Sequence, residues 1–430
     1  MLETLRNAWK VKELRNKILF TIMIIVIFRI GSAIPVPFVA YDALRSAAKT
    51  ASENSEFFSY FSILTGGGLE YGAIFAMSVT PYINSSIIIQ LLCVAIPALE
   101  RLSKEGEEGQ KKLASITRYA TIILALIQGV AYFFYLKGNG YLSISGTGAM
   151  VFAGFVIVLA LTAGSALVMW LGEQIDNKGV GNGISILLFA GIISRGPQAY
   201  ATLKASWSSN KAAVIAVVVL FLAVVAFIVW MTNAERRVPI QYAKRVVGNK
   251  MYGGQNTHIP IKVNMSGVMP IIFASSILML PTMILSFVSQ STALKQPSWY
   301  KVLALFSTRG VFYAVIYFLL IIAFAYFYST IQFNPVEMAN NLRKNGGAIP
   351  GIRPGKPTSD FISKILSRVT LLGAVFLSVI AILPIVLGNI GQINISLGGT
   401  SILIMVGVAL DTVQNLESQM MMRHYKGFLD

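Results

Sequence analysis

Ten long apolar runs restrict this chain of 430 residues to a membrane-spanning fold. The hydrocarbon core of a bilayer is roughly 30 Å thick, and a helix needs about 20 apolar residues to cross it. Strands of a membrane β-barrel are about ten residues long and alternate apolar with polar positions, which these runs do not. The sequence therefore predicts an all-α polytopic membrane protein with ten transmembrane helices. Their expected positions are residues 18–35, 72–98, 116–136, 149–172, 183–203, 212–232, 264–289, 310–331, 368–388 and 400–422.

The composition excludes a soluble globular domain. Charged residues make up 12% of the chain and hydrophobic residues 55%, whereas charged residues contribute about 25% in ordinary soluble domains. Before the first run, charges recur at helical spacing, and no small-residue cleavage site follows that run. We therefore expect an amphipathic helix on the membrane surface rather than a removable signal peptide.

Positive charges indicate the orientation of the chain in the membrane. It has 35 Lys and Arg residues against 18 Asp and Glu residues. Most of the Lys and Arg residues precede the first run, follow the last run, or lie in every second connection between runs. Because cytosolic loops retain Lys and Arg, this pattern predicts that both termini are cytosolic.

Two of the basic connections, residues 233–263 and 332–367, are long for a compact helical bundle. Long connections are usually functional or disordered, and we favour a functional role. The segment GGAIPGIRPGKP, from Gly346 to Pro357, is typical of turns and should place Arg353 at a tip. A basic protrusion suits an acidic partner, which is nucleic acid, lipid or a protein surface.

The second run is unusually polar for a transmembrane helix. Its segment from Ser78 to Leu92, SVTPYINSSIIIQLL, also contains a central proline, Pro81. The polar side chains either form hydrogen bonds between helices or line a path that opens to water. The residue types alone leave both interpretations open. The polar residues are Thr80, Asn84, Ser85, Ser86 and Gln90.

The residue patterns of an enzyme or a metal site are missing. His258 and His424 lie far apart without a Cys, Asp or Glu cluster at ligand spacing, so no metal is expected. Cys93 is the only cysteine and should be an ordinary buried residue. Asp411 is the one clear carboxylate within an apolar run, which provides no catalytic pair. The glycine pattern GVGNG, residues 179–183, follows no strand and predicts a tight turn rather than a phosphate site, so we expect no cofactor.

Seven regions of the chain resemble a known family. They are SVTPYINSSIIIQLL, KEGEEGQKKL, GNGISILLFAGI, QYAKR with THIPIKVN, NMSGVMPIIFASS, GAIPGIRPGKPT and GGTSILIMVGVALD. Their sequence and order resemble the bacterial SecY family, the channel subunits of the Sec protein translocon, over nearly the whole chain. The resemblance implies a channel in the cytoplasmic membrane of a bacterium. It also implies two five-helix halves, residues 1–205 and 206–430, related by a pseudo-twofold axis in the membrane plane.

The resemblance assigns residues to a seal. Family members narrow to a ring of apolar side chains, which excludes ions by dewetting yet can yield around an unfolded polypeptide. The matching ring positions are Val79, Ile83, Ile184, Leu188, Ile272 and Ile404. A short plug helix at residues 57–66 is implied on the outer side of the ring. Its residues are Phe57, Phe58, Tyr60, Phe61, Ile63 and Leu64.

A lateral gate is implied between the second and third helices on one side and the seventh and eighth on the other. Hydrophobic segments would leave through it into lipid, because interhelical hydrogen bonds of roughly 0.6–2 kcal/mol are weak enough for a signal sequence to replace. The polar side chains of the second run would then both form hydrogen bonds between helices and line the path. The polar cluster matches Asn84, Gln128 and Asn264. The lining matches Ser85, Ser86, Ile87, Gln90, Val268 and Leu280.

The resemblance also implies partners. The long basic loops would bind the SecA motor ATPase or the ribosome, whose RNA phosphates favour Lys and Arg. Membrane subunits resembling SecE and SecG would flank the helices in the lipid bilayer, and the clients would be signal sequences and unfolded secretory or membrane proteins. The chain itself would hydrolyse nothing. The candidate docking residues are Arg236, Arg237, Lys244, Arg245 and Arg353.

Two other classes of membrane protein are alternatives. A secondary transporter with inverted repeats would bind a small solute at the midplane through ionisable groups and half-helix ends, whereas this chain offers aliphatic residues there. An intramembrane hydrolase would need a nucleophile with a base, paired carboxylates or a metal, and the sequence contains no readable set of this kind.

Overall fold

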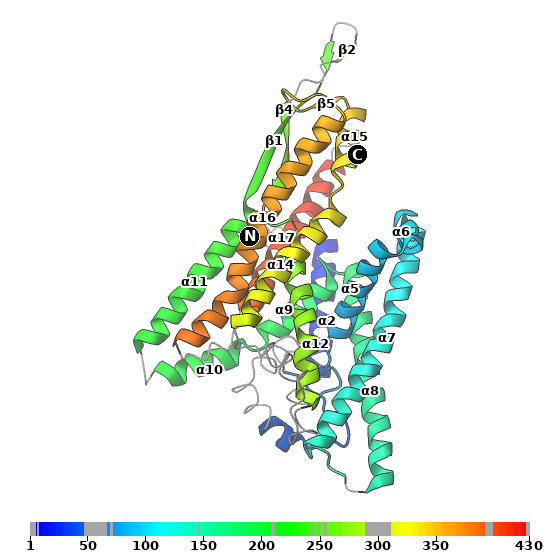
Figure 1. Ribbon diagram of the computed structural model, residues 1–430, viewed down its shortest axis with the longest axis vertical. Coiled ribbons are helices and arrows are strands. Elements are labelled where there is room, and N and C mark those ends of the chain that lie inside the picture. The colour runs from blue at the N-terminus through cyan, green and yellow to red at the C-terminus, as the bar shows by residue number, and fades with distance from the viewer. Residues whose placement is uncertain are drawn as a thin grey trace. The chain divides into compact units, whose positions relative to one another are not determined.

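Helices dominate the structure, a computed structural model (Figure 1). It describes residue 6 and residues 8–46, 67–68, 72–144, 146–207, 211–242, 245–247, 250–252, 256–265, 267–288, 311–391 and 399–426. The chain forms two compact units. The first contains Met1–Val214, Met279–Arg309 and Ile393–Asp430, and the second contains Ile215–Leu278 and Gly310–Gln392.

The first unit is built from helices. α5, α7 and α8 pack against one another, while α9 packs against both α8 and α17. The helices that lie wholly in this unit are α2 (Lys12–Gly31), α5 (Thr80–Ala95), α6 (Pro97–Lys104), α7 (Glu107–Gly138), α8 (Thr147–Lys178), α9 (Gly183–Ile193), α10 (Gly196–Trp207) and α17 (Gly399–Lys426). One of its hydrophobic cores consists of Val36, Leu44, Ala76, Met77, Leu136, Ile157 and Leu161.

A proline explains the sharp bend between α5 and α6. Ile96 precedes Pro97 and has extended backbone angles, φ −110° and ψ 113°, because the proline ring disfavours the helical conformation of the residue before it. The two helices meet at 103°. α5 therefore ends at Ala95, within the predicted run at residues 72–98.

The second unit combines helices with strands. It contains most of α11 (Lys211–Asn233), the first half of α12 (Met269–Val288), α14 (Val311–Gln332), α15 (Pro335–Lys344) and α16 (Lys356–Gly391). α14 and α16 pack along each other. Its strands are β1 (Glu235–Tyr242), β2 (Arg245–Val247), β3 (Lys250–Tyr252), β4 (Asn256–Lys262) and β5 (Gly347–Ala348).

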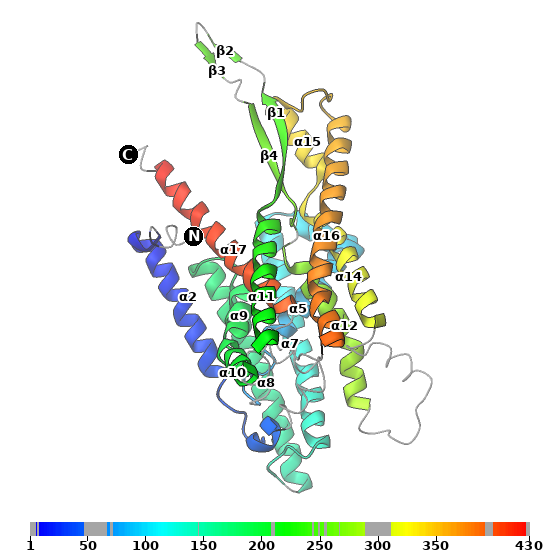
Figure 2. The same cartoon turned by 90° about the vertical axis from the view of Figure 1, so that its left-hand side faces the viewer.

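The long connection at residues 233–263 forms a β-hairpin, which was not predicted from the sequence. β1 pairs antiparallel with β4 from Glu235 opposite Lys262 to Gln241 opposite Asn256, and β5 pairs with the other edge of β1. The sheet order is therefore β4-β1-β5, and β2 and β3 form a second pair. Figure 2 shows β1 and β4 as a long ribbon with β2 and β3 at its far end. The helical class is confirmed, but with a small sheet attached.

Each of the ten predicted apolar runs contains at least part of a helix. Within the described ranges, five helices are long and apolar enough to cross a membrane, or six if α5 and α6 form one bent span. The count of ten transmembrane helices is consistent with this finding and stays a prediction. The two halves at residues 1–205 and 206–430 also stay a prediction, since the compact units group α17 with the N-terminal helices.

Candidate functional site

The chain enters α5 through a strained turn beside the first candidate ring residue. Ser78 has a φ of +48°, in the left-handed region that residues other than glycine rarely adopt. It is 1% exposed, as is Val79. The Ser78 hydroxyl has no hydrogen-bond partner among the described residues. The Ile83 N–H donates to the Val79 carbonyl oxygen at 3.0 Å, so Val79 and Ile83 stand one helical turn apart.

The predicted tight turn at residues 179–183 is confirmed, and it fixes the start of α9 against α8. The Gly183 N–H donates to Asp176 Oδ1 at 2.7 Å, and Asn182 Oδ1 caps the new helix by accepting from the Ser185 N–H at 3.0 Å. A methyl group on Gly183 would overlap the carbonyl oxygen of Gly172. This close approach fixes the start of α9, the helix that contains the candidate ring residues Ile184 and Leu188.

The same turn contacts both ends of the described chain. Val180 shares a hydrophobic cluster with Ala8, Leu14 and Leu416. Its N–H donates to the Thr21 hydroxyl at 3.2 Å. Lys17 Nζ donates to Gln419 Oε1 at 3.2 Å. The start of α2, the end of α17 and the α8–α9 turn therefore lie together in the first unit, as expected if both termini are on one side of the membrane.

Five of the six candidate ring residues lie in the first unit, on α5, α9 and α17 or at the start of α5. Leu188 is 3% exposed and Ile404 is fully buried. Ile184 is half-buried, and its Cδ1 atom lies over Gly172 of α8. Ile272 belongs to the second unit, near the start of α12, and is also buried. Their convergence into one ring stays a prediction.

The candidate gate residues of α5 contain buried polar atoms without partners. Gln90 Nε2 donates to Ser86 Oγ at 3.3 Å within the helix. Asn84 Oδ1 and Ser85 Oγ are buried and have no hydrogen-bond partner in the part of the chain that is described. Leaving such an atom unpaired costs about 1–3 kcal/mol. α5 therefore carries unsatisfied hydrogen-bonding capacity at two of its four predicted polar gate positions.

The remaining gate positions lie on α5, on α7, before α12 and within α12. Ile87 of α5 is buried, and Gln128 of α7, the helix that packs on α5, is half-buried. Asn264 and Val268 belong to the second unit; Val268 is buried, and Asn264 Oδ1 again has no described hydrogen-bond partner. The side chain of Leu280 lies outside the described residues. The predicted plug residues 57–66 lie outside them as well.

Three of the five candidate docking residues, Arg236, Arg237 and Arg353, lie on a folded body of the second unit, which we call the hairpin head. It comprises β1, β4, β5, α15 and the first turns of α16, and it has its own core. The buried core residues are Val238, Ile240, Ile261, Leu342, Ile349, Ile362 and Leu366. The described parts of the two long connections thus pack together into one folded body rather than forming independent loops.

Three docking candidates are exposed on this head. Arg236 and Arg237 are exposed on β1, and Arg237 Nε contacts Glu235 Oε1 at 2.7 Å. Arg353 is exposed in the turn-rich segment before α16, where its carbonyl oxygen accepts from the Thr358 hydroxyl at 2.9 Å. Arg245 lies on β2, but its side chain is outside the described residues, as is the whole of Lys244.

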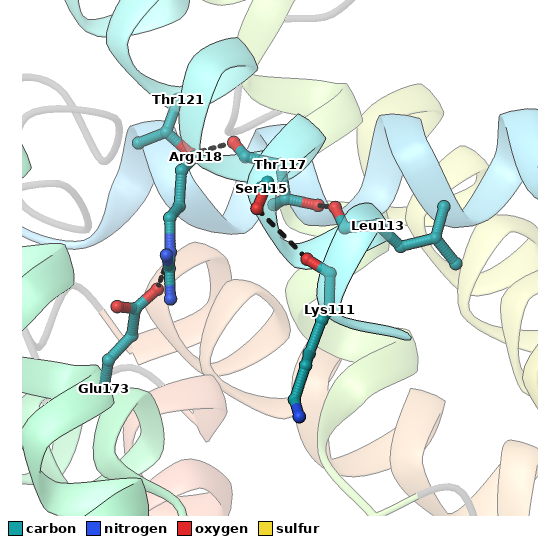
Figure 3. Close-up of polar contacts among 7 residues, drawn as sticks. All are labelled: Lys111, Leu113, Ser115, Thr117, Arg118, Thr121 and Glu173. Atoms are coloured by element: carbon teal, nitrogen blue, oxygen red, sulfur yellow. Dashed lines mark hydrogen bonds and ion pairs between the residues drawn. The ribbon is translucent and has the colours of Figure 1, made fainter. Parts of the chain in front are cut away.

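Sequence reasoning missed an ion pair between α7 and α8. Arg118 Nε lies 2.6 Å from Glu173 Oε1, and Figure 3 shows the two side chains pointing toward each other. Nearby hydroxyls of α7 form hydrogen bonds within their own helix. Thr117 donates to the Leu113 carbonyl oxygen at 2.9 Å, and Thr121 donates to the Thr117 carbonyl oxygen at 2.7 Å. The only sequence signal was the opposite charge of the two residues near the same expected membrane surface.

Potential metal ligands do not gather within the described segments, which contain no group of three or more His, Cys, Asp or Glu residues that could hold an ion. The half-buried Cys93 is a free thiol on α5.

Comparison with known proteins decides the family. The family model described as SecY matches residues 73–413. The chain is 42% identical to the protein translocase subunit SecY of Streptomyces galbus over 447 aligned residues, with 100% of both chains covered. The chain belongs to the SecY family. The SecY subunit of Thermotoga maritima is 43% identical over 434 residues, covering 100% of this chain and 98% of the relative.

Solved structures agree with the SecY fold. The structure described as that of a protein conducting channel aligns with a TM-score of 0.65 at 17% identity, covering 94% of this chain and 92% of the other. Sec61 in a canine ribosome-channel complex from the endoplasmic reticulum aligns with a TM-score of 0.60 at 15% identity, with the same coverage. At these identities the likeness establishes the shared fold, while the roles of individual SecY residues stay predictions.

Proposed function

We propose that the chain is a protein-conducting channel that passes unfolded secretory polypeptides across the cytoplasmic membrane of a bacterium and releases hydrophobic segments sideways into lipid. The observation that carries this proposal is the identity of 42% to a translocase subunit over the whole length of both chains. The apolar pore residues supply the physical means, because an aliphatic constriction excludes ions at rest and deforms around a polymer.

The seal is formed by Val79, Ile83, Ile184, Leu188, Ile272 and Ile404, with the plug at residues 57–66 on its outer side. The burial of Val79, Leu188 and Ile404 supports this assignment, since an aliphatic constriction excludes ions only where its side chains are closely packed. Residues 73–78 lead directly from the plug region into α5 and are held to the segment after α2: the Ile74 N–H donates to the Ile34 carbonyl oxygen at 3.0 Å.

The gate hypothesis is supported by the unpaired amide oxygens. Asn84 and Asn264 each bury a carbonyl oxygen without a hydrogen-bond partner among the described residues, and they belong to the two different compact units. A buried acceptor gains about 1–3 kcal/mol when a donor reaches it. Each oxygen can therefore accept from a polar group across the gate or from a passing segment, so a signal sequence can compete for the gate.

The hairpin head is the docking surface. Arg236, Arg237 and Arg353 present guanidinium groups on a rigid support, which suits carboxylates and phosphates better than a mobile loop does. We propose the SecA motor ATPase and the ribosome as its partners, by analogy with the ribosome-channel complex of the Sec61 relative. SecE-like and SecG-like subunits complete the channel, and the chain has no catalytic activity of its own. Both termini face the cytosol.

Photocrosslinking of a stalled client tests the channel. A photoreactive amino acid is placed at Ile83 and at Ile272 in vesicles, and a secretory chain is arrested during export. We expect adducts with the client at both positions. Val219 of α11, which is 59% exposed, serves as the control position and should react with lipid. Client adducts at Val219 with none at Ile83 and Ile272 would contradict the proposed path.

A further inference from the structure

Asn264 is joined to the hairpin head by a short segment that packs directly on α16. The Val263 N–H donates to the Ala234 carbonyl oxygen at 2.8 Å, which continues the β1–β4 ladder one step toward the helices. Val263 in turn lies against Gly373, a buried residue within α16. The base of the hairpin is therefore held between its own partner strand and a transmembrane helix.

Gly373 is required for this close approach. A methyl group at this position would overlap the Val263 carbonyl oxygen, and it would lie 3.3 Å from the carbonyl carbon of Val263 and 3.8 Å from Cα of Asn264. The atoms that it meets belong to the backbone, which cannot rotate away as a side chain can. Glycine weakens a helix interior relative to alanine, so the contact with Val263 gives a physical reason for a glycine here.

α16 is itself firmly placed next to this contact. Ser329 Oγ of α14 and Thr370 Oγ1 of α16 are 3.0 Å apart, and the Tyr326 hydroxyl donates to the Ser367 carbonyl oxygen at 3.1 Å. Both bonds join α14 to α16 within two turns of Gly373. A shift forced at Gly373 is therefore taken up by the hairpin base rather than by α16.

The segment after Asn264 leads directly into α12. Gly267 has a φ of +60°, which makes a turn, and the N–H groups of Ile271 and Ile272 donate to the Val268 carbonyl oxygen at 3.2 Å. The ring of Phe273 packs edge-on against Phe324 of α14 at 5.8 Å between centroids. Movement of Val263 would thus move Asn264 first and then the start of α12, which carries Ile272.

We propose that Gly373 is a positioning residue for the lateral gate: its lack of a side chain lets the hairpin base seat on α16 and so sets the position of Asn264. This inference rests on the proposed function, because the gate role of Asn264 is part of it. A side chain at position 373 displaces the Val263 carbonyl and Asn264 with it. Asn264 Oδ1 is then displaced from the position in which, under the proposed function, it accepts a hydrogen bond across the gate, and weaker signal sequences suffice to open the gate.

Signal-sequence selectivity tests the proposal. Export of two clients, one with an intact and one with a defective signal sequence, is measured in cells and divided by the amount of full-length channel in the membrane. For Gly373→Ala we expect export of the defective client to rise about 3- to 10-fold, as for the loss of one interhelical hydrogen bond. Export of the intact client should be unchanged. The control Gly148→Ala also adds a methyl group to a helix, where no atom lies within 4 Å, and should leave selectivity unchanged.

A double variant distinguishes the positioning of Asn264 by Gly373 from a general destabilisation of the closed channel. If Gly373 acts through Asn264, the combination Gly373→Ala with Asn264→Ala should relax selectivity no further than Asn264→Ala alone, because effects through one shared contact are not additive. Full additivity would overturn the proposed coupling.

The remaining outcomes distinguish the inference from the proposed function. If Asn264→Ala relaxes selectivity while Gly373→Ala behaves like Gly148→Ala, the positioning role is wrong and the gate stands. If Asn264→Ala has no effect, the gate assignment itself is wrong. If Gly373→Ala does not accumulate, Val263→Pro decides, because it removes the N–H that donates to Ala234 without adding bulk at position 373; unchanged selectivity there would overturn the proposal.

Discussion

Single residues of this chain combine burial with unsatisfied or strained groups next to candidate pore and gate positions. Ser78 is the clearest case, because it has a φ of +48° and a buried hydroxyl without a described hydrogen-bond partner, directly before Val79. Backbone strain at a functional position costs about 1–3 kcal/mol and persists only when surrounding structure imposes it. The residues of α5 itself have no positive φ and so do not carry this cost of backbone strain.

Substitution of Ser78 tests the strain. Ser78→Gly should raise the thermal stability of the purified channel, by about 1 kcal/mol, because glycine adopts a positive φ without steric penalty. Ser78→Val should lower it, since a β-branched residue is a true outlier in that region. Thermal unfolding in detergent, followed by the loss of soluble monomer, provides the measurement. Equal stability of the glycine and valine variants would show that the backbone at residue 78 is not strained.

Elements are positioned by close backbone contacts at glycines. The α8–α9 turn brings Gly183 against Gly172 and ties the turn to α2 and α17 through Val180. The hairpin base meets α16 at Gly373. In both places a helix that carries candidate pore residues begins just beyond the contact, so the position of the helix depends on the absence of a side chain.

Gly183→Ala should destabilise the first unit. The added methyl group overlaps the Gly172 carbonyl oxygen and must separate α9 from α8, which by analogy with overpacked cores costs about 1–3 kcal/mol. The expected result is a lower unfolding temperature and less channel in the membrane. Gly148→Ala is again the matched control, because its methyl group meets no atom within 4 Å. A normal unfolding temperature for Gly183→Ala would contradict the tight α8–α9 contact.

At the scale of the whole molecule, the sequence located the long apolar helices, because length and apolar content define a candidate membrane-spanning segment, while the count of ten spans stays a prediction. It missed the hairpin, although β1 alternates buried Val238 and Ile240 with exposed Arg237 and Pro239. The charged residues and the proline of that segment made its alternation of apolar and polar residues, the pattern typical of a strand, difficult to recognise. The contacts at Gly183 and Gly373 were not predictable, because they depend on which helices meet in three dimensions.

Charge reversal on the hairpin head tests docking at this scale. Arg353→Glu should lower motor-driven export by about tenfold, because it places a like charge against an acidic partner surface. Assembly with the SecE-like subunit, measured by copurification, should be unchanged. Arg343→Glu reverses another exposed charge of the same head, on α15, and should have a smaller effect. Normal export by Arg353→Glu would remove this residue from the docking surface.

The central claim is that aliphatic side chains keep the resting channel impermeable to ions. The most direct test is the ion conductance of planar bilayers containing the purified channel without a client. Ile83→Ala combined with Ile404→Ala should raise the resting conductance by at least about tenfold, because a wider constriction no longer dewets. Ile157→Ala, a comparable truncation of a buried residue of α8, should leave it at the level of the unsubstituted channel. An unchanged conductance in the double variant, or an equal rise in Ile157→Ala, would contradict the account.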